Sequence, residues 1–103
     1  MKQAKIFVDG ILAGLLEEME RGKAYRFTYE EGYRGPSVSL EMPTTQAVYD
    51  YDRFPPFFEG LLPEGVMLEG LLRQSKLDRG DLMGQLTTVG KDLVGNVTVE
   101  PVV

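Results

Sequence analysis

The residue types that carry out most enzyme chemistry are scarce in this sequence. It contains no histidine and no cysteine, so the commonest general base, the thiol nucleophile and the usual nitrogen and sulfur metal ligands are missing. Carboxylate pairs occur at residues 17–18, 30–31 and 50–52, where they could act as acid/base pairs or calcium ligands. Solvated turns carry such pairs routinely, and no nucleophile stands beside a base. The sequence therefore predicts no catalytic residues, no metal site and no enzymatic activity.

Three glycines form the only pattern that suggests nucleotide binding. A phosphate-binding loop needs clustered glycines ahead of a helix, together with a lysine or serine that reaches the nucleotide. Gly60, Gly65 and Gly70 are instead spaced five residues apart across helix-forming sequence. We therefore expect no nucleotide site and no cofactor.

Length and composition are those of one folded domain. The chain has 103 residues, of which 43% are hydrophobic and 26% are charged, which is typical of soluble globular proteins. We expect a single domain over residues 1–103 with its own hydrophobic core. Disorder along the whole chain and a fibrous repeat are both excluded by this balance.

Charge and hydropathy argue against binding to nucleic acids or membranes. The 16 acidic and 11 basic residues give a net charge of -5, whereas DNA-binding surfaces are rich in lysine and arginine. No apolar run is long enough to cross a bilayer, and the N-terminus does not resemble a signal peptide. The absence of cysteine agrees with a reducing compartment. We expect a cytoplasmic protein that binds neither nucleic acid directly nor membranes.

The first half of the chain shows the two-residue alternation of half-buried strands. Residues 5–16 read as two short strands joined by a tight turn at Asp9-Gly10. Residues 24–29 place three aromatic rings on one face of a strand, and these rings are expected to face the core. Residues 37–43 alternate in the same way until a proline ends them, which predicts a fourth strand. The polar and aromatic stretch 44–53 is expected to be a surface connection with one helical turn.

The second half has helical spacing until the last strand. A short helix is expected to start at the prolines within 54–62, a second to span 63–75, and a third to span 79–88 with a cap at or near Asp78 and its end at Gly90. A final strand over 94–99 stops at Pro101. The predicted fold is α+β: a small antiparallel sheet of about five strands, with two or three short helices inserted before the last strand.

The apolar cluster around residues 54–58 is either core or a docking surface, and core is the more common role of such clusters. Neighbouring helical residues point about 100° apart, so Phe57 and Phe58 cannot both be central on one buried stripe. Met67, which follows a Pro-Glu-Gly interruption, is a flexible side chain that suits either a core gap or a partner. We therefore expect part of this region to be exposed or docked.

Three segments, 37–43, 54–72 and 81–95, resemble in order the sequence elements of the first N-terminal subdomain of HipA-like serine/threonine kinases. The most specific are Leu61-Leu62-Pro63-Glu64-Gly65 and the later Val89-Gly90-Lys91-Asp92-Leu93-Val94-Gly95. The resemblance covers nearly the whole chain, here without the kinase. It implies a HipS-like antitoxin of a three-gene HipBST-type toxin-antitoxin system.

In such a system the antitoxin binds and inhibits a HipT-like serine/threonine kinase, and a HipB-like helix-turn-helix protein that binds operator DNA joins the complex. The expected partner-binding residues surround the Pro-Glu-Gly sequence and are Phe57, Phe58, Leu61, Pro63, Glu64, Val66 and Met67. Stand-alone members can present a bulky aromatic residue near this sequence to the kinase active site. This chain has no tryptophan, so the resemblance does not imply that it plugs that site.

The resemblance leaves a second interpretation open. The chain could instead be the N-terminal regulatory or structural subdomain of a full-length HipA-like kinase toxin, separated from its catalytic body. Both interpretations predict a non-catalytic chain that contacts a kinase.

Overall fold

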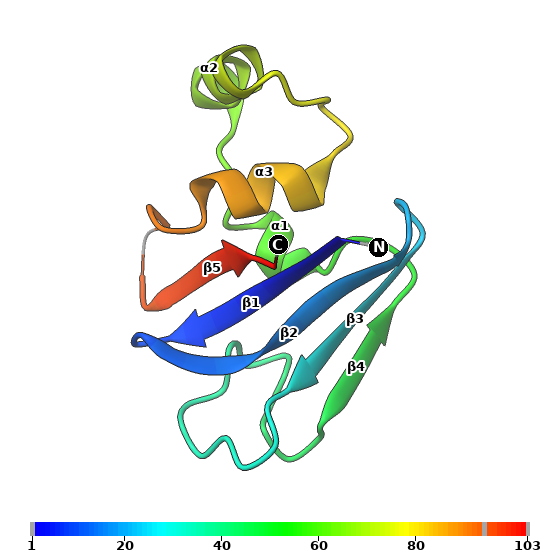
Figure 1. Cartoon of the computed structure of the whole chain (residues 1–103), viewed down its shortest axis with the longest axis vertical. Coiled ribbons are helices and arrows are strands. Elements are labelled where there is room, and N and C mark those ends of the chain that lie inside the picture. The colour runs from blue at the N-terminus through cyan, green and yellow to red at the C-terminus, as the bar shows by residue number, and fades with distance from the viewer. Residues whose placement is uncertain (1, 94, 103) are drawn as a thin grey trace.

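A twisted antiparallel sheet forms one layer of the fold (Figure 1). The computed structural model describes residues 2–93 and 95–102. Within these residues the sheet has five strands in the spatial order β4-β3-β2-β1-β5. They are β1 (Lys2–Val8), β2 (Ile11–Glu20), β3 (Ala24–Tyr29), β4 (Val48–Tyr51) and β5 (Val97–Pro101).

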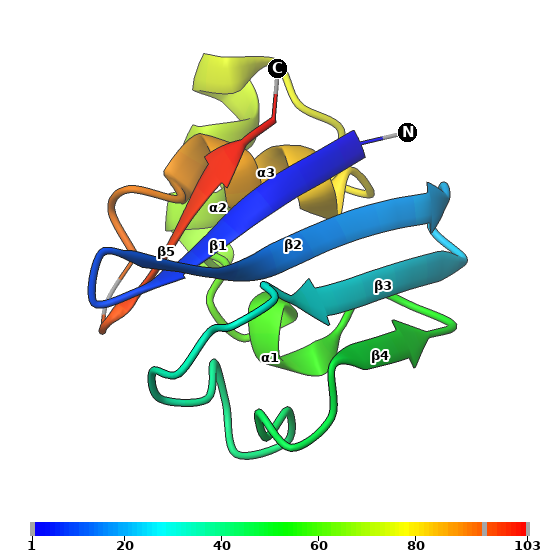
Figure 2. The same ribbon diagram turned by 60° about the horizontal axis from the view of Figure 1, so that its bottom comes forward.

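Three helices lie between β4 and β5 in the described part of the sequence. They are α1 (Pro56–Glu59), α2 (Gly65–Ser75) and α3 (Leu82–Val89). α3 packs on β5 and β1, α1 packs on α3, and α2 lies on the outer side of α3, as Figures 1 and 2 show. The predicted α+β class, with helices inserted before the last strand, is confirmed.

The core lies between the sheet and α1 and α3. Alternate residues of each strand face it, because successive side chains of a strand point to opposite faces. Tyr25, Phe27 and Tyr29 of β3 are all buried, as predicted from their spacing. The rest of the core includes Ile6, Leu16, Phe58, Met83, Leu86 and Val99, none more than 1% exposed. Each such burial contributes roughly 1.5–3 kcal/mol to folding.

The hairpin predicted at Asp9-Gly10 is present between β1 and β2. Both turn residues have positive φ, 51° at Asp9 and 78° at Gly10, as a tight two-residue hairpin turn requires. The ladder then runs from Val8↔Ile11 to Lys2↔Glu18 with one irregularity between Ile6 and Phe7. The two strands are longer than the sequence alone indicated.

The strand predicted over residues 37–43 is wrong, because this segment is an irregular loop. Val38 and Met42 are buried as their alternation suggested, but Leu40 is 99% exposed. The Tyr29 hydroxyl accepts a hydrogen bond from the Val38 amide at 2.9 Å and donates one to the Met42 carbonyl. A side chain thus satisfies backbone groups that a neighbouring strand would otherwise pair with.

The fourth strand is β4, in a stretch that was expected to be a surface connection. Its residues pair with β3 in the register Tyr25↔Tyr51 and Phe27↔Tyr49, and both tyrosines of β4 are half-buried. The alternation covers only four residues, which is too short to distinguish a strand from a loop by sequence pattern. Residues 48–51 therefore form a strand because they pair with the aromatic strand β3.

The ends of the last two elements differ by a few residues from the prediction. α3 begins after Asp81, whose side chain caps it, and Gly90 ends it as expected. β5 includes Pro101, which pairs with Ala4; a proline is tolerated there because β5 is an edge strand. The predicted start of this strand at Val94 lies outside the described residues.

Candidate docking surface

The Pro-Glu-Gly sequence forms the turn between α1 and α2. The chain leaves α1 in a tight turn in which the Leu61 amide donates to the Phe58 carbonyl at 3.1 Å. Gly65 then opens α2 with a φ of 58°, a conformation that side chains with a Cβ rarely adopt. The glycine of this sequence is therefore needed to redirect the chain into α2.

The two adjacent phenylalanines of α1 have different environments. Phe58 is completely buried and contacts Phe27 at a ring separation of 6.1 Å. Phe57 is half-buried and meets Phe58 edge to face at 5.2 Å. Direct contact of Phe58 with a partner would require it to leave the core, so we assign it the role of supporting Phe57 and exclude it from the contact surface.

The residues after the turn are on the surface. Val66 is 87% exposed and Met67 is 76% exposed, and Glu64 is also exposed. No residue of α2 is fully buried, and even its three leucines are only half-buried. An amphipathic helix normally buries its apolar face against the core, so α2 leaves apolar surface without a partner inside the described chain.

A hollow of about 270 Å³ lies between the turn, α2 and the end of α3. Its lining, which we call the α2–α3 hollow, consists of Leu61, Pro63, Met67, Val89, Asp92 and Leu93. Three of these residues belong to the predicted contact set, and the other three belong to segment 89–95. We call segments 61–65 and 89–95, the most specific parts of the sequence resemblance, the two signature segments. The fold thus brings the two signature segments, about 25 residues apart, into one surface.

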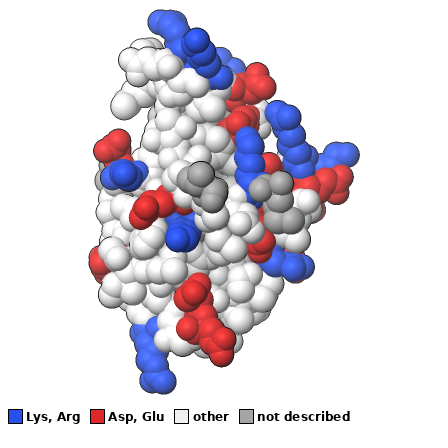
Figure 3. Space-filling view, viewed as in Figure 1, with Lys and Arg blue, Asp and Glu red and all other residues white. Residues whose placement is uncertain are grey.

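Figure 3 shows the same region from outside. A continuous uncharged area covers α2 and part of α3 in the upper half of the view, with lysine and arginine side chains at its upper edge. Val66 and Met67 are the exposed large apolar side chains of α2, and exposed apolar surface is typical of interaction sites in soluble proteins. Among the described residues, Val66, Met67 and the α2–α3 hollow therefore form the candidate docking surface.

The segment between α2 and α3 is held by polar contacts instead of apolar packing. Arg79 forms an ion pair with Glu69 of α2. The buried Gln85 side chain of α3 donates to the Asp78 carbonyl at 3.2 Å and to the Arg79 carbonyl at 2.9 Å. The Gln85 bonds hold the connecting segment to α3, whereas α2 is joined to that segment here by an exposed ion pair, which contributes little to stability.

Asp81 caps α3 and connects it to β1. Its carboxylate accepts hydrogen bonds from the Gly84 amide at 2.9 Å and from Lys2 Nζ at 2.8 Å. Burial raises the pKa of this carboxyl, but the hydrogen bonds from Lys2 and Gly84 outweigh burial and leave its pKa below the ordinary 3.8. Asp81 is therefore charged at neutral pH and stabilises the helix end that faces away from the hollow.

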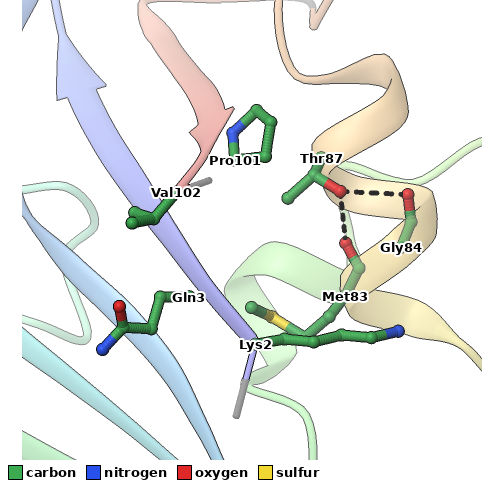
Figure 4. A pocket seen from close by; sticks show the side chains of 7 residues that line it. All are labelled: Lys2, Gln3, Met83, Gly84, Thr87, Pro101 and Val102. Atoms are coloured by element: carbon green, nitrogen blue, oxygen red, sulfur yellow. Dashed lines mark hydrogen bonds between the residues drawn. The ribbon is translucent and has the colours of Figure 1, made fainter.

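A second hollow of about 240 Å³ lies where α3 meets the sheet edge (Figure 4). Lys2 and Gln3 of β1, residues of α3 and the end of β5 line it. Its polar side chains already have partners, since Thr87 donates within α3 to the Met83 and Gly84 carbonyls and Lys2 pairs with Asp81. We assign no ligand to this hollow.

The described residues give no other sign of a chemical site. In ranges 2–93 and 95–102, no cluster of three or more acidic side chains could hold a metal ion. Within the same ranges, no helix combines the length and apolar character needed to cross a bilayer.

Comparison with known proteins identifies the family and the fold. Residues 4–100 match the family model described as the HipA N-terminal domain. The chain belongs to this family. A relative, an uncharacterized protein of Haemophilus influenzae, is 30% identical over 100 residues, which are 97% of this chain and 92% of the relative.

A solved structure described as the N-terminal domain of HipA toxin has the same fold. It superposes with a TM-score of 0.78 at 28% identity and covers 100% of this chain and 94% of the solved chain. The family relationship predicted from the signature segments is confirmed. The matched domain is a non-catalytic part of HipA.

Three lining residues of the hollow were not in the predicted contact set: Val89, Asp92 and Leu93. Their segment had been used only to identify the family. The presence of both signature segments in one small domain was the available signal. Two segments that together identify a domain are good candidates for lying on a shared surface. Spacing along the chain could not show that they meet.

Proposed function

We propose that this protein is a non-catalytic antitoxin that binds and inhibits a HipT-like serine/threonine kinase of the HipA family. The observation that carries the proposal is the apolar surface of α2. Val66 and Met67 are exposed at the α2–α3 hollow, in the segment 54–72 that resembles a sequence element of the family. Exposed apolar side chains of this kind mark protein-protein interaction sites.

The Haemophilus influenzae relative supports a role as a separate polypeptide. Since 92% of that relative aligns with this chain, a protein that is little more than this domain exists in the family. A domain of this size has no space for a kinase catalytic body, so its effect on a kinase must come from binding. In this proposal the complex is cytoplasmic, and a HipB-like helix-turn-helix protein, not this chain, contacts DNA.

Binding and inhibition can be tested with purified components. The chain is mixed at micromolar concentration with its cognate HipT-like kinase, and complex formation and kinase autophosphorylation are measured. We expect a stable complex with reduced autophosphorylation. If no complex forms at that concentration, the proposal is rejected.

A matched pair of variants locates the surface. Val66→Asp places a charge at an 87% exposed position on α2, and Ile11→Asp does the same at a 62% exposed position on the first hairpin. Neither change disturbs the core. We expect Val66→Asp to weaken the complex at least about tenfold, the effect of a charge left without a partner in an interface, while Ile11→Asp leaves the affinity within about twofold.

The solved relative favours a second candidate. Its description as the N-terminal domain of HipA toxin supports a role for this chain as the N-terminal regulatory subdomain of a full-length kinase. The reading frame that follows codon 103 distinguishes the two candidates. A kinase sequence in the same frame would support the second, and a separate downstream kinase gene would support the antitoxin.

A further inference from the structure

The α2–α3 hollow combines apolar walls with one carboxylate. Leu61, Pro63, Met67, Val89 and Leu93 form the apolar lining, and Asp92 is the only charged lining residue among those described. Asp92 is exposed, and its backbone amide is fixed by a hydrogen bond to the Val89 carbonyl at 2.8 Å. This hydrogen bond holds the backbone that carries the carboxylate beside the hollow, while the side chain itself reaches solvent.

No cation of the described chain neutralises this carboxylate. The ion pairs within residues 2–93 and 95–102 involve Asp81, Asp78, Glu20, Asp50 and Glu69, and Asp92 is in none of them. The adjacent Lys91 is exposed and does not line the hollow. Asp92 is therefore solvated by water in the free protein.

Covering the hollow with a purely apolar surface would remove this water and leave the carboxylate unpaired. Such desolvation of a charge is costly, whereas a partner that supplies an opposite charge offsets the cost and fixes the register of the interface. The net charge of the chain, -5, also favours approach of a basic surface. The chemistry of the hollow thus selects an occupant that carries both apolar and basic groups.

The volume sets the size of the apolar part. An apolar cavity of about 150 Å³ accommodates a benzene-sized group, so a hollow of about 270 Å³ has room for one large apolar side chain beside the stem of a lysine or arginine. Such stems lie along apolar surface while the charged end stays at the rim.

We propose that the α2–α3 hollow binds a partner segment in which a lysine or arginine stands next to a large apolar residue. The apolar side chain fills the space against Leu61 and Met67, and the basic group pairs with Asp92. This inference rests on the proposed function, because it places the segment on the surface of the kinase. It makes Asp92 a residue that selects the partner by charge.

The test measures the affinity of the chain for the same kinase by titration calorimetry at several NaCl concentrations. Asp92→Lys reverses the charge at the hollow, and Glu31→Lys makes the same change in the loop after β3, at the opposite end of the molecule (Figure 1). We expect Asp92→Lys to weaken binding at least about tenfold and Glu31→Lys to change it less than about twofold. Asp92→Asn should reduce the dependence of affinity on salt.

A charge-reversal scan of the kinase completes the test. One exposed arginine or lysine of the kinase, changed to glutamate, should restore binding of the Asp92→Lys variant. If Val66→Asp abolishes the complex while Asp92→Lys binds as well as Glu31→Lys, the inference is wrong and the proposed function stands. If the unchanged chain does not bind the kinase, both are wrong. A chain that dimerises through this surface, with the dimer lost in Met67→Glu, would also overturn the inference.

Discussion

The carbonyl oxygen of Gly90, at the end of α3, accepts a hydrogen bond from the Val99 amide of β5 at 3.0 Å. Val99 faces the core and is 0% exposed. This contact attaches the helix to the edge strand and occupies an outward-facing amide that could otherwise pair with another chain. It also fixes the start of the segment that carries Asp92 and Leu93 into the hollow.

Gly90→Ala should destabilise the fold strongly. A Cβ at this position would overlap the Val99 carbonyl oxygen, and backbone atoms cannot move aside as a flexible side chain can. We expect a loss of at least about 2 kcal/mol in the free energy of unfolding, measured by chemical denaturation. Gly80→Ala is the matched control, because a Cβ there meets no atom within 4 Å. A loss at Gly80 equal to that at Gly90 would contradict the explanation.

Tyr25 should titrate unusually late and limit stability at alkaline pH. Burial, the hydrogen bond from its hydroxyl to Glu18 at 2.8 Å and the Glu18 charge raise the pKa of Tyr25 to about 12. Because this pKa exceeds the ordinary 10.0, the stabilisation is complete below pH 10 and is lost as pH rises through about 12. An ultraviolet titration should show one tyrosine ionising near this upper value.

Tyr25→Phe tests the same pair by removing the donor. The substitution leaves the buried Glu18 carboxylate without its hydrogen bond, so we expect a loss of about 1–3 kcal/mol at neutral pH. Tyr33→Phe removes an exposed hydrogen bond to the Pro36 carbonyl and should cost less. Equal losses for the two variants would show that burial of the Tyr25 pair does not matter.

The contribution of the α3 cap to the free energy of unfolding should depend on pH. Asp81→Ala removes the acceptor of the Gly84 amide and should cost about 1 kcal/mol at neutral pH. Since the pKa of Asp81 in the folded protein lies below 3.8, the charge contribution is present above that pH and is lost as pH falls below it. Denaturation curves of the two proteins should therefore approach each other in acid. Asp81→Asn, which keeps an acceptor, should lose less than Asp81→Ala.

Amide hydrogen exchange should be faster in α2 than in α3. No residue of α2 is fully buried, whereas α3 buries Met83, Gln85 and Leu86, and segments with few buried contacts open at low free-energy cost. Exchange followed by mass spectrometry should show this difference in the free chain. Addition of the kinase should protect α2 and leave the first hairpin unchanged. Equal protection of α2 and α3 in the free chain would contradict the inference that α2 opens at a lower free-energy cost than α3.

Local sequence determined those elements whose pattern carries its own physical reason. The hairpin at Asp9-Gly10 was predictable because few residue pairs tolerate positive φ at both positions. The buried rings of β3 were predictable because a strand alternates its faces. The Pro-Glu-Gly turn and the Gly90 segment were sufficient to place the chain in the HipA N-terminal domain family, and the order of helices before the last strand followed from their spacing.

Tertiary structure decided what depends on contacts between distant segments. Val38 and Met42 have the alternation of a strand but are bound by the Tyr29 hydroxyl, and no local pattern reveals such a contact. β4 is a strand because the paired β3 lies beside it.

The α2–α3 hollow exists only in the folded chain. Asp92 and Met67 are 25 positions apart in the sequence and line the same space. The sequence alone identified the family. The proposed partner selection depends on the two signature segments lying side by side, and this required the fold. Side chains from separate elements become neighbours only after packing.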